Sequence, residues 1–80
     1  MRDADVMARL TVILRRVFAS PTLVVTRSTT AADVPAWDSL NTLFLSMELE
    51  AEFRCDISAD ELGRVEDIGQ LVDLLTEMAR

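Results

Sequence analysis

Apolar residues in the first quarter of the chain recur at the spacing of an α-helix, and this pattern constrains the fold more than any other feature. The gaps are three residues or one, which places the side chains along one helical stripe. The stripe consists of Val6, Met7, Leu10, Ile13, Leu14, Val17 and Phe18. We therefore expect a first helix from Asp3 to Phe18, with Asp3 or Asp5 as its N-cap.

A second helix is expected to begin at Ser39, because Asp38 is a good N-cap residue and apolar residues follow it. This helix should run to about Phe53 or Arg54. Between the two helices lies a long connection, residues 20–37, which is rich in Thr, Ser, Ala and Pro. Residues 23–25 could pass for a short strand, but no partner strand is recognisable. We interpret them as an apolar plug on the core.

Two more helix starts follow the second helix. Ser58 and Glu61 form a capping box, and we expect only about one and a half turns behind it because Gly63 interrupts the segment. Asp67 and Gln70 resemble a second box, which would start a last helix. That helix should bury Ile68, Leu71, Val72, Leu75 and Met78. The predicted fold class is all-α: a small four-helix bundle with three main helices and one short one, forming a single domain over residues 1–80.

Charge and composition exclude several classes of protein. The formal net charge is −6, which argues against a nucleic-acid ligand and favours a basic protein partner. Cys55 is the single cysteine, so no internal disulfide can form, and the chain contains no His. No run approaches the roughly 18 apolar residues of a membrane-spanning helix. The first residues do not form a signal-peptide pattern, so we expect a cytoplasmic protein without a membrane partner.

The second predicted helix carries two apolar stripes on roughly opposite faces. One consists of Leu45, Leu49 and Phe53, and the other of Leu40, Leu43, Phe44 and Met47. Glu48 and Glu50 flank the second stripe, one on each side. Either the helix is central and buried all round, or the second stripe is an exposed partner-binding surface with an acidic rim. The small size of the bundle favours the partner-binding surface.

The tripeptide Asp38-Ser39-Leu40 at the start of this helix resembles the attachment motif of the acyl carrier proteins. The resemblance covers nearly the whole chain and is strongest from Asp33 to Leu75. Apolar positions of the family's pattern are matched by Leu40, Leu43, Leu45, Met47, Leu49 and Phe53, and two acidic positions by Glu50 and Glu52. The expected bundle is therefore of the acyl-carrier type.

The resemblance implies a function and a cofactor. A phosphopantetheinyl transferase would move 4′-phosphopantetheine from coenzyme A onto Ser39 with the help of Mg²⁺. Asp38 would help to hold that metal in the transferase complex, and Leu40 would contact the transferase. The thiol of the arm would carry an acyl or aminoacyl group as a thioester. The chain would thus be a monomeric carrier and not an enzyme, and its partners would include a loading ligase, synthase or transferase.

Some positions depart from the family's pattern. Phe44 stands where fatty-acid carriers have a glutamate, and Asn41 and Ala51 replace frequent acids. We interpret this as a sign of a dedicated partner with a hydrophobic notch for Phe44, in a specialised pathway of fatty acyl or polyketide type. Trp37, just before the motif, either plugs the connection onto the bundle or contacts the arm, the cargo or the partner. For Cys55 we expect a packing role.

Two questions of function stay open at the level of sequence. Peptidyl carriers more often have Gly-Gly near the serine, so the motif favours an acyl over an aminoacyl cargo. The alternative function is an unmodified helical interaction module, in which the second apolar stripe binds a partner helix and Ser39 is only structural.

Overall fold

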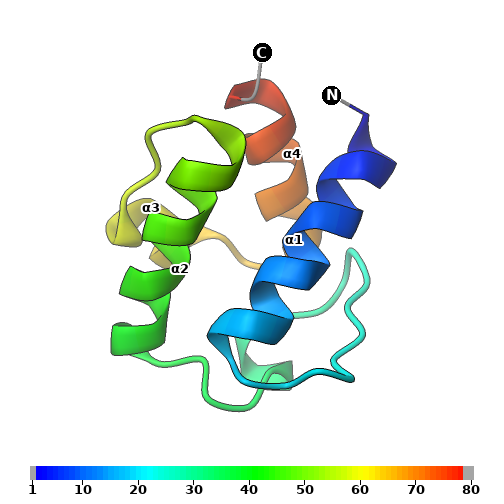
Figure 1. Cartoon of the computed structure of the whole chain (residues 1–80), viewed down its shortest axis with the longest axis vertical. Coiled ribbons are helices and arrows are strands. Elements are labelled where there is room, and N and C mark those ends of the chain that lie inside the picture. The colour runs from blue at the N-terminus through cyan, green and yellow to red at the C-terminus, as the bar shows by residue number, and fades with distance from the viewer. Residues whose placement is uncertain (1, 79–80) are drawn as a thin grey trace.

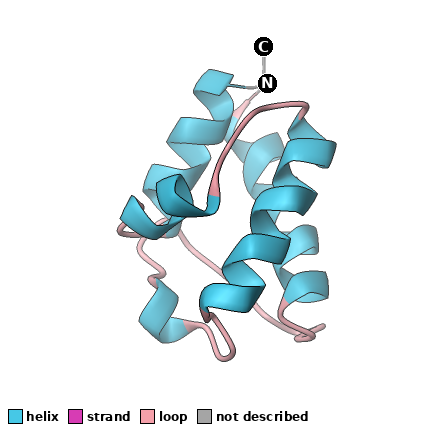
Figure 2. Cartoon of the chain, turned by 90° about the vertical axis from the view of Figure 1, so that its left-hand side faces the viewer, coloured by secondary structure: helices cyan, strands magenta, loops and turns pink. Residues whose placement is uncertain are grey.

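The computed structural model describes residues 2–78, which form four α-helices and one 3₁₀ turn and contain no strand (Figures 1 and 2). The elements are α1 (Asp3–Val17), η1 (Ala31–Asp33), α2 (Ser39–Phe53), α3 (Ala59–Arg64) and α4 (Ile68–Met78). The predicted all-α class with three main helices and a short one is confirmed. The bounds of α1 and α2 agree with the predicted ones to within one residue.

The three long helices run along the long axis of the molecule, and α3 lies across it beside α2 (Figure 1). α1 packs against both α2 and α4, while α3 packs against α2. α2 and α4 run in the same direction and α1 runs opposite to them. The start of α1 and the end of α4 therefore lie at one end of the bundle, and α2 begins at the other end.

The core is a layer of aliphatic side chains between α1, α2 and α4, closed at its ends by aromatic rings. Its fully buried members include Val6, Leu10, Leu14, Leu45, Leu49, Ile57, Val72 and Leu75. Phe18 and Phe53 are also buried. The predicted stripe of α1 and the predicted core side of α4 are thus confirmed, and Met78 packs at the edge of the core in a partly buried position.

Both ends of α1 differ from the sequence-based expectation. The N-cap is Arg2, without a capping hydrogen bond from its side chain, so the prediction of Asp3 or Asp5 as the cap is wrong. Both carboxylates lie in the first turn, where the helix dipole still favours negative charge. The helix ends before Ser20-Pro21, because Ala19 adopts a left-handed conformation with φ 50°. The Ser20 N–H then donates to the Arg15 carbonyl at 2.9 Å.

The connection from α1 to α2 is held against the start of α4 by its own backbone. The Thr29 and Arg27 carbonyls accept hydrogen bonds from the N–H groups of Ile68 and Gly69, both at 2.8 Å. The Arg27 side chain also donates to both carboxylate oxygens of Asp73 at 2.9 Å. The hydrogen bond to Asp73 and the charge of its carboxylate raise the pKa of Arg27, so the guanidinium stays protonated.

The apolar plug predicted at residues 23–25 is only partly correct. Val25 is buried and Leu23 is partly buried, whereas Val24 is 75 % exposed. No strand forms there, as expected. The 3₁₀ turn η1 within the same connection was not predicted. It is closed by Thr30 and Asp33: the Thr30 N–H and hydroxyl donate to the Asp33 carboxylate at 2.9 and 3.1 Å, and the Asp33 N–H donates to the Thr30 carbonyl at 3.0 Å.

Capping boxes begin α3 and α4, as predicted, but with two differences. Ser58 and Glu61 exchange side chain-to-backbone hydrogen bonds and start α3. Gly63 does not interrupt this helix, which continues to Arg64. At α4, Asp67 accepts from the Gln70 N–H at 2.8 Å, but the Gln70 side chain accepts from the N–H of Glu66 and not from that of Asp67. The second box is therefore only half formed.

Candidate functional site

The start of α2 is fixed by three short hydrogen bonds around Asp38. Asp38 is the N-cap, and its Oδ1 accepts from the Asn41 N–H at 2.9 Å. The Thr42 hydroxyl donates to the Asp38 carbonyl at 2.7 Å. The Asn41 side chain donates to the carbonyl of Ala36 at 2.8 Å, which ties the preceding loop to the helix. The backbone on either side of Ser39 is thus held in one conformation.

Ser39 is the first residue of α2 and is exposed to solvent. Its hydroxyl lies where the first N–H groups of the helix have no partner within the helix and where the dipole is positive. Such a position suits a negatively charged phosphodiester. Beside Ser39, a surface hollow of about 400 Å³ lies between the start of α2 and α3 and is lined by Trp37, Asp38, Ser39, Thr42, Ala59, Asp60 and Gly63.

Trp37 packs on the bundle. Its ring stacks on Phe18 with the ring centroids 5.1 Å apart and the planes inclined by 25°. This confirms the packing role that was one of the two roles considered for Trp37. The indole and Gly63 also line a smaller hollow of about 70 Å³ between α3 and α4, so Trp37 stands between this hollow and the one beside Ser39.

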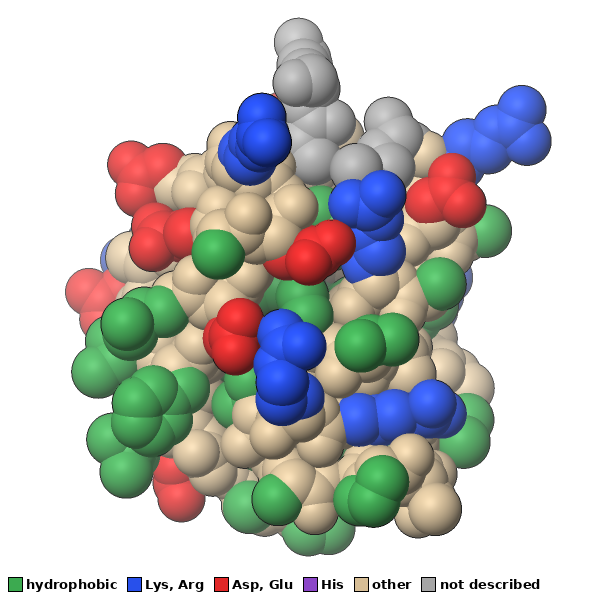
Figure 3. Space-filling view, in the orientation of Figure 1, with side chains coloured by type: hydrophobic (Ala, Val, Ile, Leu, Met, Phe, Trp, Pro, Cys, Tyr) green, Lys and Arg blue, Asp and Glu red, His purple; other side chains and the backbone are tan. Residues whose placement is uncertain are grey.

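The two stripes of α2 have opposite environments. Leu45, Leu49 and Phe53 are at most 4 % exposed. The second stripe is open to solvent, with exposed fractions of 61 % for Leu40, 48 % for Leu43, 47 % for Phe44 and 58 % for Met47. We call these four residues the apolar strip; hydrophobic side chains gather over the first half of α2 in Figure 3. The alternative of a helix buried all round is wrong.

The two glutamates predicted to flank the strip both have partners within the molecule. Glu48 accepts two hydrogen bonds from Arg16 on α1, at 3.3 and 3.1 Å. Glu50 accepts from the backbone N–H of Ile57 at 3.2 Å. Sequence reasoning missed Arg16 as a neighbour of the site, because its pairing with Glu48 depends on how α1 and α2 lie against each other.

Ser46 and Cys55 have structural roles. The buried Ser46 hydroxyl donates to the Leu43 carbonyl at 2.8 Å. The Cys55 thiol lies 3.7 Å from the carbonyl of Leu49, and burial together with the nearby charge of Glu50 raises its pKa. The thiol is therefore less reactive than a free one, in agreement with the expected packing role.

Neither a metal site nor a membrane segment is present in the described part of the chain. Residues 2–78 contain no group of three or more His, Cys, Asp or Glu side chains that could hold a metal ion. No helix among them is long and apolar enough to cross a membrane.

Comparison with known proteins gives one informative match. A scan of protein-family models and a search of curated proteins find no match. Among solved structures, the solution NMR structure of a holo acyl carrier protein from Geobacter metallireducens superimposes on this chain with a TM-score of 0.80. The two sequences are 36 % identical, and the alignment covers 90 % of this chain and 83 % of that one.

Proposed function

Since this chain belongs to the acyl carrier protein family, and is a carrier rather than an enzyme, we propose that Ser39 bears a 4′-phosphopantetheine arm that carries an acyl group. The observation that carries this proposal is the exposed Ser39 at the first turn of α2, held by the Asp38 cap beside an open hollow. The similar solved protein is a holo carrier, which supports a phosphopantetheine cofactor in this chain as well.

The residues at the start of α2 fit the proposed group. Ser39 would supply the oxygen that forms the new bond to phosphorus while the pyrophosphate bond of coenzyme A breaks. Adenosine 3′,5′-bisphosphate would leave, and the hydroxyl proton would pass to a base of the transferase. The N–H groups of the first turn that Asp38 does not cap would lie near the phosphodiester. The terminal thiol of the arm supplies the thioester chemistry. Asp38 uses Oδ1 to cap the helix, and we propose that its carboxylate also meets the Mg²⁺ of the transferase. Leu40, 61 % exposed beside Ser39, would contact the same enzyme.

We further propose that the cargo is an acyl chain of fatty acyl or polyketide type, handled in a specialised pathway. Two features support this: the motif lacks the Gly-Gly typical of peptidyl carriers, and Phe44 replaces an acid expected of carriers that serve general fatty-acid synthesis. The partners would be a phosphopantetheinyl transferase and an enzyme that loads or accepts the acyl group. Leu43, Phe44 and Met47 would contact the loading or accepting enzyme.

Intact mass measurement tests the modification. The protein is incubated with coenzyme A, Mg²⁺ and a broad-specificity phosphopantetheinyl transferase. We expect a gain of one phosphopantetheine, no gain for Ser39→Ala, and a normal gain for Ser28→Ala, which removes another exposed serine. No gain on the folded wild-type protein would overturn the proposal. It would favour the alternative of an unmodified module that binds a partner helix through the apolar strip.

A further inference from the structure

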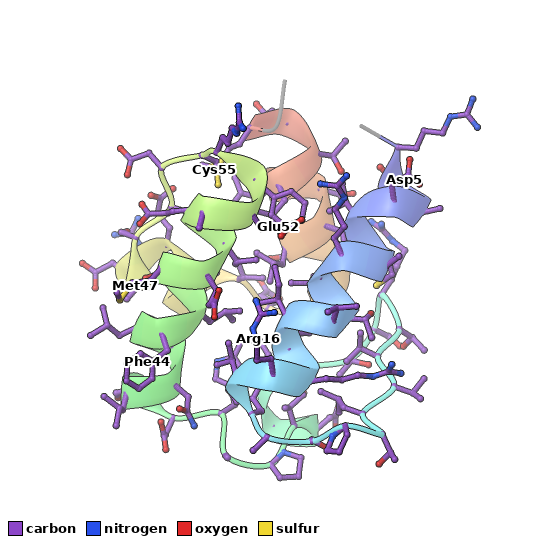
Figure 4. All side chains as sticks on the ribbon, in the orientation of Figure 1. Asp5, Arg16, Phe44, Met47, Glu52 and Cys55 are labelled. Carbon is purple, nitrogen blue, oxygen red and sulfur yellow. The ribbon has the colours of Figure 1, made fainter. Side chains whose placement is uncertain are left out.

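The half of α2 that lies next to Ser39 has no charge. From Ser39 to Met47 the helix contains no acidic or basic side chain, and the apolar strip covers its exposed side. Phe44 and Met47 project outward from α2, away from the core (Figure 4). A surface that meets this half of the helix encounters hydrocarbon, an aromatic ring and a thioether.

The acidic residues of α2 are all in its second half, and each has a partner within the molecule. Arg16 binds Glu48 through two hydrogen bonds, and Arg9 binds Glu52 at 3.2 Å. The backbone N–H of Ile57 binds Glu50. Two arginines of α1 therefore offset two of the three negative charges. We call the line along which α1 and α2 meet the α1–α2 seam, and in Figure 3 basic and acidic side chains lie next to each other along it.

α1 also carries an exposed apolar side chain, on the face that holds Arg9 and Arg16. Val12 is 57 % exposed and lies on α1 between Arg9 and Arg16, three residues after the first and four before the second, so the three share a face. Between the helices a hollow of about 410 Å³ is lined by Arg16, Val17, Phe44, Met47 and Glu48. The paired charges lie along the seam, and apolar side chains lie on both sides of it.

The net charge of −6 is concentrated elsewhere. Residues 56–67 contain five acidic side chains and a single basic one, Arg64. This segment forms the loop before α3, α3 itself and the turn before α4. A basic partner would therefore be attracted to the surface around α3, and the apolar strip would not provide that attraction.

We propose that the partner enzyme that loads or unloads the carrier docks on the apolar strip and the α1–α2 seam with an uncharged, concave apolar surface. This inference rests on the proposed carrier function. Arg9 and Arg16 are positioning residues: they hold Glu48 and Glu52 in neutral pairs, so that the partner covers this face without supplying cations. A charge covered without a partner is costly, and contacts between neutral surfaces depend little on salt. The general expectation of a basic partner does not apply to this face.

Two probes of opposite chemistry test the inference on the isotopically labelled full chain, followed through backbone amide NMR shifts. The first is oligolysine, a polycation. We expect its shifts at residues 56–67 and not on α2. In the variant Arg9→Gln/Arg16→Gln, which unpairs Glu48 and Glu52, new shifts should appear at these two glutamates. Oligolysine shifts centred on α2 of the wild-type protein would overturn the proposal.

The second probe is decyl maltoside below its micelle concentration, which has an uncharged head and an apolar tail. We expect shifts at Val12, Leu43, Phe44 and Met47 that are equal in about 20 mM and about 400 mM NaCl. Phe44→Glu should abolish them, whereas Val24→Glu, which changes the most exposed apolar side chain of the connection, should leave them unchanged. Shifts elsewhere, or equal effects of the two variants, would overturn the proposal.

Two further measurements separate the possible failures. The mass gain with coenzyme A and transferase should be the same for Val24→Glu and for the wild-type protein. If the wild-type protein gains no mass, the carrier function fails whatever the probes show. If it gains mass but the probes contradict the expectation, only the docking inference fails. Light scattering that shows a dimer, disrupted by Phe44→Glu, would assign the strip to a second copy of the chain and overturn the proposal.

Discussion

Asp38 combines two roles that can be separated by substitution. Its Oδ1 caps α2 through the Asn41 N–H, and its charge is proposed to meet the transferase metal. Asp38→Asn keeps an oxygen acceptor, so its stability should stay close to that of the wild-type protein, whereas Asp38→Ala should lose about 1 kcal/mol. Both variants should slow the transfer of phosphopantetheine to Ser39. Urea unfolding and the time course of the mass gain measure the two effects.

A matched control lies at the start of α4. Asp67 caps that helix in the same way, through the Gln70 N–H, but it is not proposed to take part in the transfer. Asp67→Asn should therefore leave the transfer rate unchanged. If Asp38→Asn is modified as fast as the wild-type protein, its carboxylate has no role beyond capping.

At the level of single residues, the sequence predicts a helix start well where two signals coincide. Asp38 was identified correctly because an apolar stripe begins directly behind it. Asp3 and Asp5 were misassigned, because the same carboxylate is favourable both at the N-cap and in the first turn. The pairing of Glu48 with Arg16 spans 32 positions in the chain. It depends on the register between two helices, which no local pattern encodes.

The two glycines lie in helices and should respond oppositely to the same substitution. A Cβ at Gly63 in α3 would meet nothing within 4 Å, so Gly63→Ala should stabilise the protein by about 0.5–1 kcal/mol. A Cβ at Gly69 in α4 would lie 3.0 Å from the Arg27 carbonyl oxygen, which accepts the Gly69 N–H. Gly69→Ala should therefore destabilise the protein by about 1–3 kcal/mol.

Urea unfolding of the two alanine variants beside the wild-type protein checks this pair. Equal effects, or a destabilised Gly63→Ala, would contradict the structural difference between the sites. The sequence alone treated Gly63 as a break in α3 and said nothing of the contact at Gly69. The reason is that Gly69 lies against backbone atoms of residue 27, and a carbonyl has no side-chain signature that reveals which segment it will approach.

Elements that follow from the spacing of side chains could be predicted, whereas segments held by backbone contacts could not. The long helices follow from the spacing of their apolar residues, and the open strip of α2 follows from counting two stripes on a helix in a small bundle. The connection between α1 and α2 has no such repeat. Its contacts with α4 use the carbonyls of Arg27 and Thr29, and its 3₁₀ turn depends on short-range pairing of Thr30 with Asp33. Its path therefore became known only from the structure.

For the whole molecule, the balance between net charge and ion pairs should determine how salt affects stability. The surface of the described chain carries the ion pairs Arg9–Glu52, Arg16–Glu48, Arg27–Asp3 and Arg27–Asp73. Their side chains are 39–64 % exposed, and pairs of this kind contribute only about 0–1 kcal/mol each. Repulsion within an acidic chain opposes the compact state, and salt screens it.

Because the acids are concentrated in residues 56–67, we expect this repulsion to outweigh the loss of the exposed pairs. The thermal unfolding midpoint should rise between about 10 mM and about 300 mM NaCl. Asp56→Asn and Glu66→Gln, which neutralise exposed carboxylates of this segment, should raise the midpoint at low salt and reduce its dependence on salt. Arg27→Gln, which removes the contact with Asp73, should lower the midpoint at both concentrations. A midpoint that falls as salt is added would mean that the ion pairs of α1, α2 and α4 contribute more to stability than the repulsion costs. Repulsion among the carboxylates of residues 56–67 would then not limit the stability of the fold.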